Sequence, residues 1–216
     1  MTTTKISHFS TYDVLILADG LFPQKEEIQK LIIESSVVVC CDGAAQKLLA
    51  FGRMPDYVVG DLDSVTPELK KQYPERMVHR PDQNSNDLTK SVEFCISKGL
   101  RNIVIVGATG LREDHTLANI SLLHHYTPLA DNVVMVSDFG IFTPISNSTV
   151  FLSYKGQQVS IFSLSTDCAI STVGLKYLIE NRSLNSWWEG TLNESVGEDF
   201  AIVLHTPGRL IIYQVY

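Results

Sequence analysis

Acidic side chains follow several short apolar runs of this sequence, each just after the run ends. Asp61 and Asp63 stand one residue apart in the stretch GDLDSV, directly after the run Tyr57–Val59. Alternate side chains of an extended chain point to the same side, so these two carboxylates can face one point. Two like charges at 4 Å repel by roughly 4 kcal/mol in an effective dielectric of about 20, so either some of these acids stay protonated or a cation lies among them.

Other apolar runs end in the same way. The further acidic residues in such positions are Asp42, Asp82, Asp87 and Asp114. In an open parallel sheet the carboxyl ends of the strands meet at one rim, where ligands bind. Each Asp taken singly also fits a turn or a helix cap, but turn chemistry does not require acids after four successive strands. Oxygen ligands without nearby Cys or His favour Mg²⁺, with a structural Ca²⁺ site as the alternative.

The stretch GATGLREDH supplies groups that suit an anion. Gly107 and Gly110 lack side chains, so backbone N–H groups there can approach a phosphate closely. Lys90, Arg112 and His115 can offset its charge, and an Arg guanidinium matches phosphate oxygens in a fork. A metal, a phosphate loop and cations together are the equipment of phosphoryl-type transfer, in which catalysis is mostly positioning and charge stabilisation.

The elements that must position these groups alternate between β-rich runs and amphipathic helical patterns. Strands are expected at residues 14–18, 37–41, 57–59, 77–79, 103–106 and 133–136. After about Phe139 short β-rich runs are separated by turn residues, with no helical pattern between them. We therefore expect a mainly parallel, Rossmann-like α/β domain over residues 1–146 and a smaller antiparallel β-sandwich over residues 147–216.

Composition narrows the function classes. The 216 residues carry a formal net charge of −7, which disfavours non-specific binding to nucleic acid. The apolar run at residues 14–18 is too short to span a membrane, and the N-terminus lacks the layout of a signal peptide. The four cysteines form no C-x-x-C pair and are interpreted as buried small hydrophobic residues. A cytoplasmic protein is expected.

Taken together, the motifs resemble the thiamine pyrophosphokinase family. The matching stretches are DGA (42–44), GDLDS (60–64), DQNSNDLTK (82–90), GATGLREDH (107–115) and GLKYLIENRSLNSWWEGTLNES (174–195). The resemblance implies transfer of pyrophosphate from ATP to the hydroxyl of thiamine, which gives thiamine diphosphate and AMP. It also implies a homodimer whose active sites lie between the subunits.

The resemblance further implies roles for individual residues. The implied Mg²⁺ ligands are Asp61, Asp63 and Asp87. The implied ATP-binding residues are Asp42, Gln83, Lys90, Gly107, Gly110, Arg112, Asp114 and His115. The implied catalytic residues are Asp61, Asp87, Asp114, Lys90 and Arg112, and which carboxylate would serve as a base stays open. The implied thiamine-binding residues are Trp188, Thr191 and Asn193.

Two departures from the family pattern concern the phosphate loop and the thiamine segment. The family commonly has Gly-Gly before its Arg, where this chain has Gly110-Leu111, and Thr191-Leu192-Asn193 replaces small hydroxyl residues. Thiamine is a flat cation and suits an aromatic face. If Trp187 and Trp188 lie in a strand, they face opposite ways, so at most one meets the substrate.

Two other function classes compete with this interpretation. Another Mg²⁺-dependent nucleotide enzyme, such as a nucleotidyltransferase, would also place paired aspartates at a strand end but would release pyrophosphate. A non-catalytic sensor would bind ATP or thiamine without turnover. The retained carboxylates and Lys90 favour an enzyme, since a protein that only binds needs fewer of them.

Overall fold

The computed structural model describes residues 4–6 and 12–216, which divide into two compact units. One unit contains residues 12–138, and the other combines residues 4–6 with residues 139–216. Each is described by itself below. Most of the opening segment, on which the expectation of no signal peptide partly depends, lies outside the described residues.

The first unit is an α/β domain built on six parallel strands. They are β2 (Val14–Leu17), β3 (Val38–Cys41), β4 (Tyr57–Gly60), β5 (Met77–His79), β6 (Asn102–Val106) and β7 (Asn132–Ser137). Their order is β7-β6-β2-β3-β4-β5, and every neighbouring pair within the unit is parallel. The chain builds outward from β2 to β5 and then returns to β6, so the strand order reverses between β2 and β6.

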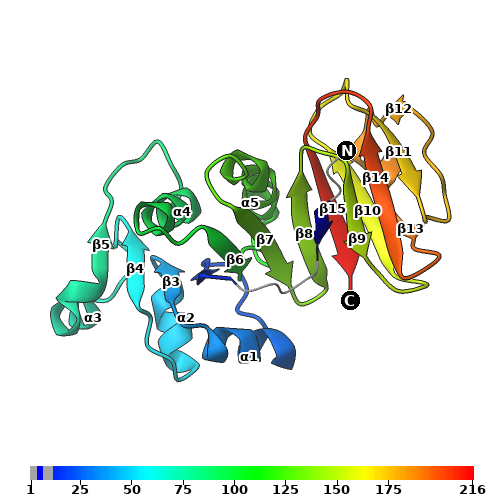
Figure 1. The fold of residues 1–216 in the computed structure, drawn as a ribbon. Coiled ribbons are helices and arrows are strands. Elements are labelled where there is room, and N and C mark those ends of the chain that lie inside the picture. Colours follow the sequence, from blue (N-terminus) through cyan, green and yellow to red (C-terminus); the bar gives the residue numbers. More distant parts are fainter. Residues whose placement is uncertain (1–3, 7–11) are drawn as a thin grey trace. The chain divides into compact units, whose positions relative to one another are not determined.

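Helices cover both faces of this sheet. They are α1 (Glu26–Glu34), α2 (Ala44–Ala50), α3 (Pro67–Gln72), α4 (Asp87–Ser97) and α5 (Glu113–Tyr126), with the short 3₁₀ helix η1 at Pro74–Arg76. Figure 1 shows α4 and α5 on one face and α1 and α2 on the other. Because both faces are covered, β2 and β3 consist entirely of buried residues, VLIL and VVCC.

Two helix starts follow from local side-chain chemistry. Thr66 accepts a hydrogen bond from the backbone N–H of Leu69 at 3.3 Å and so caps α3, with Pro67 in the first turn. Asn86 accepts one from the N–H of Thr89 at 2.9 Å and caps α4. The second cap fixes the residue that opens α4, which is Asp87, at the carboxyl edge of the sheet.

The second unit is a β-sandwich. One sheet has the order β1-β9-β14-β11-β12, and the strands β13-β10-β15-β8 form the other layer. The bounds are β1 (Thr4–Ile6), β8 (Gly140–Ile145), β9 (Thr149–Leu152), β10 (Gln158–Ser163), β11 (Ala169–Val173), β12 (Arg182–Ser183), β13 (Asn193–Glu194), β14 (Asp199–Leu204) and β15 (Leu210–Val215). Alternate residues of both layers share one buried core, in which Phe151 and Phe200 stack 5.1 Å apart.

The domain expectation and the structure differ over one strand. The sequence interpretation separated the domains at residues 146 and 147, whereas the compact units divide after Asp138. β8 lies between these positions, pairs with β15 along its whole length and falls in the sandwich unit. Pro144 within β8 hides the strand from sequence reading, because Pro is disfavoured inside sheets. The four cysteines are free and buried, as predicted.

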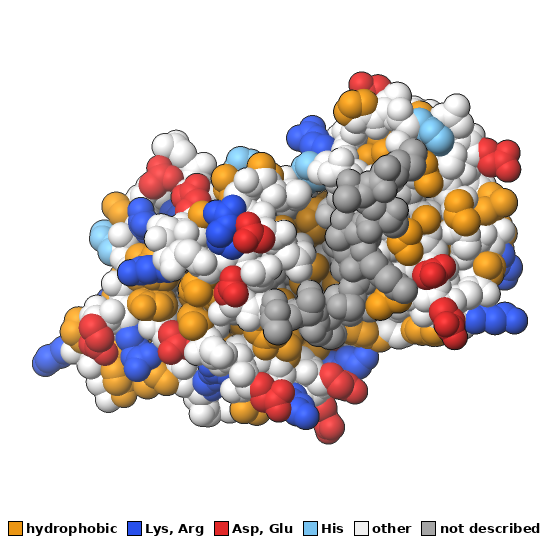
Figure 2. All heavy atoms as spheres, in the orientation of Figure 1, with side chains coloured by type: hydrophobic (Ala, Val, Ile, Leu, Met, Phe, Trp, Pro, Cys, Tyr) orange, Lys and Arg blue, Asp and Glu red, His pale blue; other side chains and the backbone are white. Residues whose placement is uncertain are grey.

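The surface adds two observations. On the face shown in Figure 2, described Lys and Arg side chains stand singly or beside Asp and Glu, rather than in one broad basic patch. Among the described helices, none combines the length and the hydropathy that a membrane span requires.

Candidate active site

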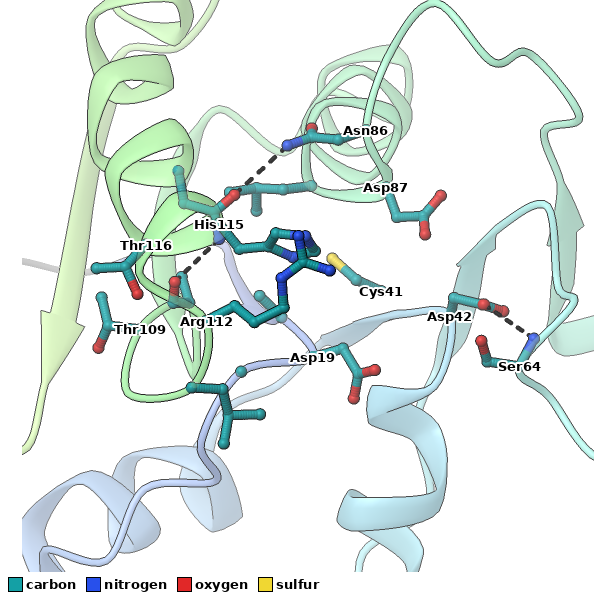
Figure 3. Close-up of a pocket in the computed structure, with 16 residues that line it drawn as sticks. Asp19, Cys41, Asp42, Ser64, Asn86, Asp87, Thr109, Arg112, His115 and Thr116 are labelled. Atoms are coloured by element: carbon teal, nitrogen blue, oxygen red, sulfur yellow. Dashed lines mark hydrogen bonds between the residues drawn. The ribbon is translucent and has the colours of Figure 1, made fainter.

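A pocket of about 380 Å³ opens where the strand order of the α/β unit reverses. Loops after β2, β3 and β6 and the first turns of α4 and α5 form its walls, as Figure 3 shows. Such a crevice at the carboxyl ends of the strands is the usual ligand site of a doubly wound sheet. The lining residues used below are Asp19, Gly20, Cys41, Asp42, Ser64, Asn86, Asp87, Ala108, Thr109, Leu111, Arg112, His115 and Asn119.

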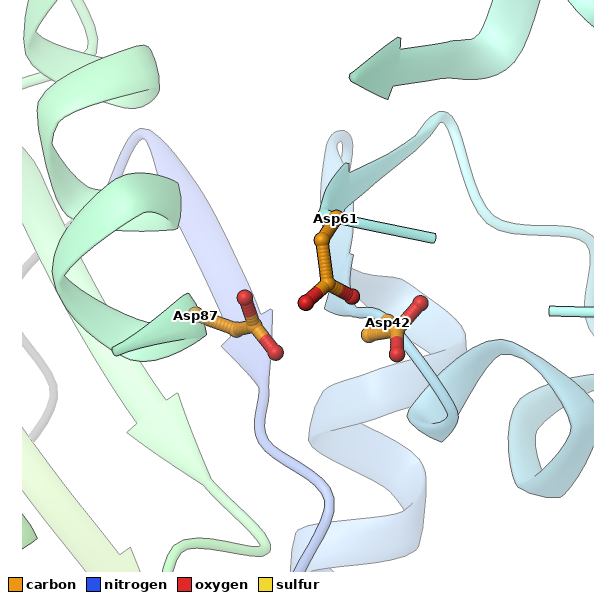
Figure 4. A group of neighbouring side chains, drawn as sticks. All are labelled: Asp42, Asp61 and Asp87. Carbon is orange, nitrogen blue, oxygen red and sulfur yellow. The ribbon is translucent and has the colours of Figure 1, made fainter. Parts of the chain in front are cut away.

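Three carboxylates from three different loops converge at one side of this pocket. Asp42 follows β3, Asp61 follows β4 and Asp87 opens α4, and one oxygen from each lies within 4.8 Å of the others (Figure 4). The sequence predicted that acids after separate strands would meet, and these three do. Asp82 instead accepts bonds from its neighbours Asn84 and Ser85, as a local turn former does.

Gly60 leaves the room that this convergence needs. A Cβ atom at Gly60 would lie 3.0 Å from the Cβ of Asp42 and 3.1 Å from Oδ1 of Asp87. Either contact is tighter than side chains normally tolerate. The glycine before Asp61 therefore serves close approach between two of the three acids.

Asp42 is the most buried of the three, with only 6% of its surface exposed. Its Oδ2 accepts a hydrogen bond from the backbone N–H of Ser64 at 3.1 Å, but Oδ1 is buried and has no partner among the described residues. Desolvation, opposed by that hydrogen bond, raises the pKa of Asp42 above its ordinary value. A buried acceptor without a donor is costly, so this oxygen is suited to a cation or to a hydrogen-bond donor of a ligand.

Asp61 is held in its ionised form. The backbone N–H of Asp63 donates to Oδ1 at 3.1 Å and the Gln83 amide donates to Oδ2 at 3.3 Å. These two bonds, in that order of importance, lower the pKa of Asp61. Asp63 itself is exposed and its carboxylate is not part of the three-acid group, so its role as a metal ligand stays a prediction.

Asp87 pairs with the one lysine predicted for the site. Lys90 Nζ lies 3.0 Å from Asp87 Oδ1, and only 5% of the Lys90 side chain is exposed. The two residues are three apart on α4 and so share a face of the helix. This buried ammonium offsets part of the negative charge of Asp87 and also lowers the pKa of the neighbouring Asp61.

The glycine-rich loop after β6 forms the next wall. Gly107 and Gly110 have φ angles of +66° and +88°, a region that favours glycine. A Cβ at Gly110 would also lie 2.8 Å from the Cβ of Leu21. Leu111, which departs from the family pattern, is exposed and lines the pocket, so the departure changes the wall without blocking the loop's turn.

Arg112 and Asp114 form a two-point ion pair at the start of α5. The guanidinium Nε lies 3.0 Å from Oδ1 and Nη2 lies 2.5 Å from Oδ2. The hydrogen bonds from Arg112 lower the pKa of Asp114 to about 2. Arg112 and His115 line the pocket, but Asp114 does not; its contact with the site runs through Arg112.

The residues predicted for thiamine lie in the sandwich unit. Asn193 is buried, accepts from the N–H groups of Tyr177 and Glu194, and donates to the carbonyl of Tyr177 at 2.7 Å. Thr191 donates to the carbonyl of Trp188 at 2.8 Å. The Asn193 side chain therefore links the backbone of Tyr177 to that of Glu194. Its contact with thiamine stays a prediction.

The tandem tryptophans do not lie in a strand, so the alternation considered for a strand does not apply to them. Trp187 begins a 3₁₀ helix, η2 (Trp187–Gly190), which Ser186 and Glu189 close with a reciprocal cap. Trp187 donates to the carbonyl of Ser163 at 3.1 Å, whereas 75% of Trp188 is exposed. The cap, which the sequence shows as S-x-x-E, could have indicated this turn.

Sequence reasoning missed Asp19 and Asn119, which line the pocket, and the lysine that pairs with Asp19. Asp19 follows β2 just as the other acids follow their strands, so the same signal was present. Lys47, in the middle of α2, forms an ion pair with Asp19 at 2.8 Å. Asn119 donates to the carbonyl of Ala108 at 2.9 Å from the second turn of α5, a position that no local motif indicates.

The fold and site define an α/β protein with a carboxylate-lined pocket at the reversal of its strand order, joined to a β-sandwich. Residues 28–135 match the family model "Thiamin pyrophosphokinase, catalytic domain", and residues 140–213 match "Thiamin pyrophosphokinase, substrate-binding domain". The chain belongs to the thiamin pyrophosphokinase family.

Individual relatives agree with the family match. Thiamin pyrophosphokinase 1 of Caenorhabditis elegans is 29% identical over 160 residues, which are 68% of this chain and 65% of that protein. Thiamine pyrophosphokinase 3 of rice is 27% identical over 213 residues, 84% of this chain and 79% of that protein. The crystal structure of thiamine pyrophosphokinase from Bacillus subtilis has the same fold, with a TM-score of 0.77, 21% identity, and coverage of 94% of this chain and 98% of that one.

Proposed function

We propose that this protein is a thiamine diphosphokinase that transfers pyrophosphate from ATP to the hydroxyl of thiamine and releases AMP. The observation that carries the proposal is the convergence of Asp42, Asp61 and Asp87, with Lys90 paired to Asp87, at one side of the pocket that Asp42 and Asp87 line. Family membership supports an enzyme with these substrates. The α/β unit would bind ATP and the sandwich would contribute to thiamine binding.

The donor set fits Mg²⁺. All three acids offer hard oxygen ligands, and Oδ1 of Asp42, which has no partner in the described part of the chain, is an acceptor that a cation would satisfy. Asp61 and Asp87 would hold the ion with Asp42, and Asp63 would join them if its side chain turns inward. When bound, Mg²⁺ offsets the charge of the phosphate oxygens.

The residues of the chain would divide the remaining work. Lys90 and Arg112 would bind phosphate oxygens, with Asp114 holding the guanidinium in place. The backbone of Gly107 and Gly110 would let the polyphosphate approach the loop. The lowered pKa values of Asp61 and Asp114 make both poor proton acceptors. A loose transition state needs little activation of the thiamine hydroxyl.

We further propose a cytoplasmic homodimer. Four free, buried cysteines are compatible with a reducing compartment. The sandwich unit exposes large apolar side chains that a second copy would cover: Val173, Tyr177, Leu178, Trp188 and Leu192. Light scattering should then give twice the mass of the chain, and a fully active monomer would refute the dimer.

The direct test mixes the protein with thiamine, ATP and Mg²⁺ and separates the products by chromatography. Thiamine diphosphate and AMP in equal amounts are expected, and product formation should stop when EDTA is added. Released pyrophosphate with a nucleotidylated acceptor would instead indicate a nucleotidyltransferase. Binding of ATP or thiamine without any product would indicate a sensor.

A further inference from the structure

Asp19 stands at the reversal of strand order and is held there by Lys47. The Lys47 ammonium lies 2.8 Å from Asp19 Oδ1, 2.9 Å from the Asp19 carbonyl and 2.8 Å from the Gly20 carbonyl. These contacts match the three donors of an ammonium group. One side chain of α2 thus fixes both the carboxylate and the backbone of the turn that follows β2.

The same turn is tied to the glycine-rich loop across the crevice. The N–H of Ala18 donates to the carbonyl of Val106 at 2.9 Å, and the N–H of Gly20 donates to that of Gly107 at 2.7 Å. The N–H of Leu21 continues the series to Thr109 at 2.8 Å. Asp19 is therefore positioned against α2 on one side and against the loop after β6 on the other.

Gly43 leaves room for the carboxylate of Asp19. A Cβ at Gly43 would lie 2.7 Å from Asp19 Oδ2, a distance that real side chains do not adopt. The φ of Gly43 is −59°, which any residue can adopt, so the glycine serves close approach rather than an unusual backbone. Gly43 of the DGA motif thus lets the Asp19 carboxylate lie against the start of α2.

The chemistry of Asp19 narrows what it can bind. Lys47 occupies Oδ1, while Oδ2 has no hydrogen-bond partner among the described residues and the side chain lines the pocket. An ionised carboxylate only accepts hydrogen bonds, so it repels phosphate and suits hydroxyl donors. Asp19 also lies outside the three-acid group, and its lysine partner makes it a poor extra cation ligand.

We propose that Asp19, positioned by Lys47, accepts a hydrogen bond from a ribose hydroxyl of the nucleotide and makes the pocket select ribonucleotides over deoxyribonucleotides. Carboxylates do bind ribose hydroxyls in the crevices of other doubly wound sheets. The inference rests on the proposed function for the identity of the nucleotide. It adds a sugar-binding residue at the point where β2 and β6 diverge.

The test compares two changes that remove the same hydrogen bond, one in the protein and one in the ligand. Isothermal titration with Mg²⁺ present measures the Kd of ATP, 2′-deoxy-ATP and 3′-deoxy-ATP for the wild type, Asp19→Ala and Asp19→Asn. The wild type should bind ATP on the order of tenfold more tightly than one of the deoxynucleotides, since a bond to a charged acceptor is lost. In Asp19→Ala the three Kd values should agree within about twofold.

Asp19→Asn keeps the shape and one acceptor oxygen and should retain part of the discrimination. Lys47→Met should reduce the discrimination between ATP and the deoxynucleotides, because Lys47 acts through Asp19. Lys47→Arg keeps the positive charge and should retain most of that discrimination. Asp131→Asn is the matched control: Asp131 pairs with Arg101 at 2.7 Å on the surface, away from the pocket, and its loss should leave all Kd values unchanged.

Two results would overturn the inference: equal wild-type affinity for the three nucleotides, or an Asp19→Ala variant that weakens all of them by one factor. Parallel turnover assays with thiamine separate this inference from the proposed function. Discriminating binding without thiamine diphosphate would refute the function and keep the inference. Turnover without sugar discrimination would refute the inference and keep the function. A wild type that binds no nucleotide would refute both.

Discussion

The two units bury polar side chains equally deeply but satisfy them differently. In the sandwich, Gln157 and Gln214 are 5% and 2% exposed. Gln214 Nε2 donates to Gln157 Oε1 and to the carbonyl of Leu152, both at 3.0 Å, and Gln157 Nε2 donates to the carbonyl of Val215 at 2.7 Å. In the α/β unit Asp42 is 6% exposed, yet its Oδ1 has no partner among the described residues.

The difference separates stability from function. A buried network that is fully paired stabilises one arrangement of the chain, because breaking any bond leaves a buried group unsatisfied. A buried carboxylate that lacks a partner and faces two others costs stability until a ligand compensates it. Substitutions in the three-acid group and substitutions at fully paired structural contacts should therefore have opposite signatures, and four variants test this expectation.

The largest effect is expected from Asp61→Asn. It removes a charge from the three-acid group, so the rate of thiamine diphosphate formation should fall by on the order of 10² to 10³, the scale of lost electrostatic stabilisation. The melting temperature without metal should change little or fall slightly, because the variant weakens the two hydrogen bonds that favour the ionised form of Asp61. Enzyme assay and thermal melting check both. An active variant, or one that melts far below the wild type, would contradict the contrast.

Asn193→Ala should show the reverse signature. It leaves the backbone groups of Tyr177 and Glu194 without their partner, so we expect a loss of about 2 to 3 kcal/mol in the free energy of unfolding. Denaturant unfolding measures it, and titration should give an unchanged Kd for ATP. If stability is instead unaffected and only the KM for thiamine rises, Asn193 acts as a thiamine-binding residue.

Asp42→Asn should stabilise the protein in the absence of metal. Burial raises the pKa of Asp42, so just above the ordinary aspartate pKa the folded state binds more protons than the unfolded state. The free energy of unfolding of the wild type then falls as pH rises from the ordinary aspartate pKa through the raised pKa of Asp42. The variant has no carboxyl at this position, so its stability should not show this decrease. At neutral pH in EDTA we expect the free energy of unfolding of the variant to be higher than that of the wild type by about 1 kcal/mol, which is the scale of a typical hydrogen bond.

Mg²⁺ provides the complementary measurement for the same variant. It should raise the melting temperature of the wild type by binding the folded state, and should raise that of Asp42→Asn less. Thermal melts with and without Mg²⁺ at several pH values check both parts. A variant that is less stable than the wild type in EDTA would show that Asp42 is a structural residue.

The smallest effect is expected from Thr66→Ala. It removes the cap of α3, so stability should fall by about 0.5 to 1 kcal/mol. α3 begins just after the loop that carries Asp61. This loop is also held by the hydrogen bond from the Ser64 N–H to Asp42, so activity should change less than twofold. A large loss of activity would show instead that the cap positions the metal-binding loop.

Much of the α/β unit could be predicted from the sequence. Short β-rich runs predicted all six of its strands, and Thr66-Pro67 predicted a helix start. The sandwich was less predictable, because β8 contains Pro144 and the strands β12 and β13 are only two residues long. Short strands carry little periodicity, and their pairing depends on distant partners.

The sequence by itself determined which groups reach the rim, because strand ends and the residues after them are local features. Only the tertiary structure decided which of these groups meet. Asp42, Asp61 and Asp87 converge while Asp63 and Asp82 do not, and Asp19 depends on a lysine 28 residues away. Distances of a few ångströms between loops depend on sheet order and on glycines such as Gly43 and Gly60, and no local spacing encodes them.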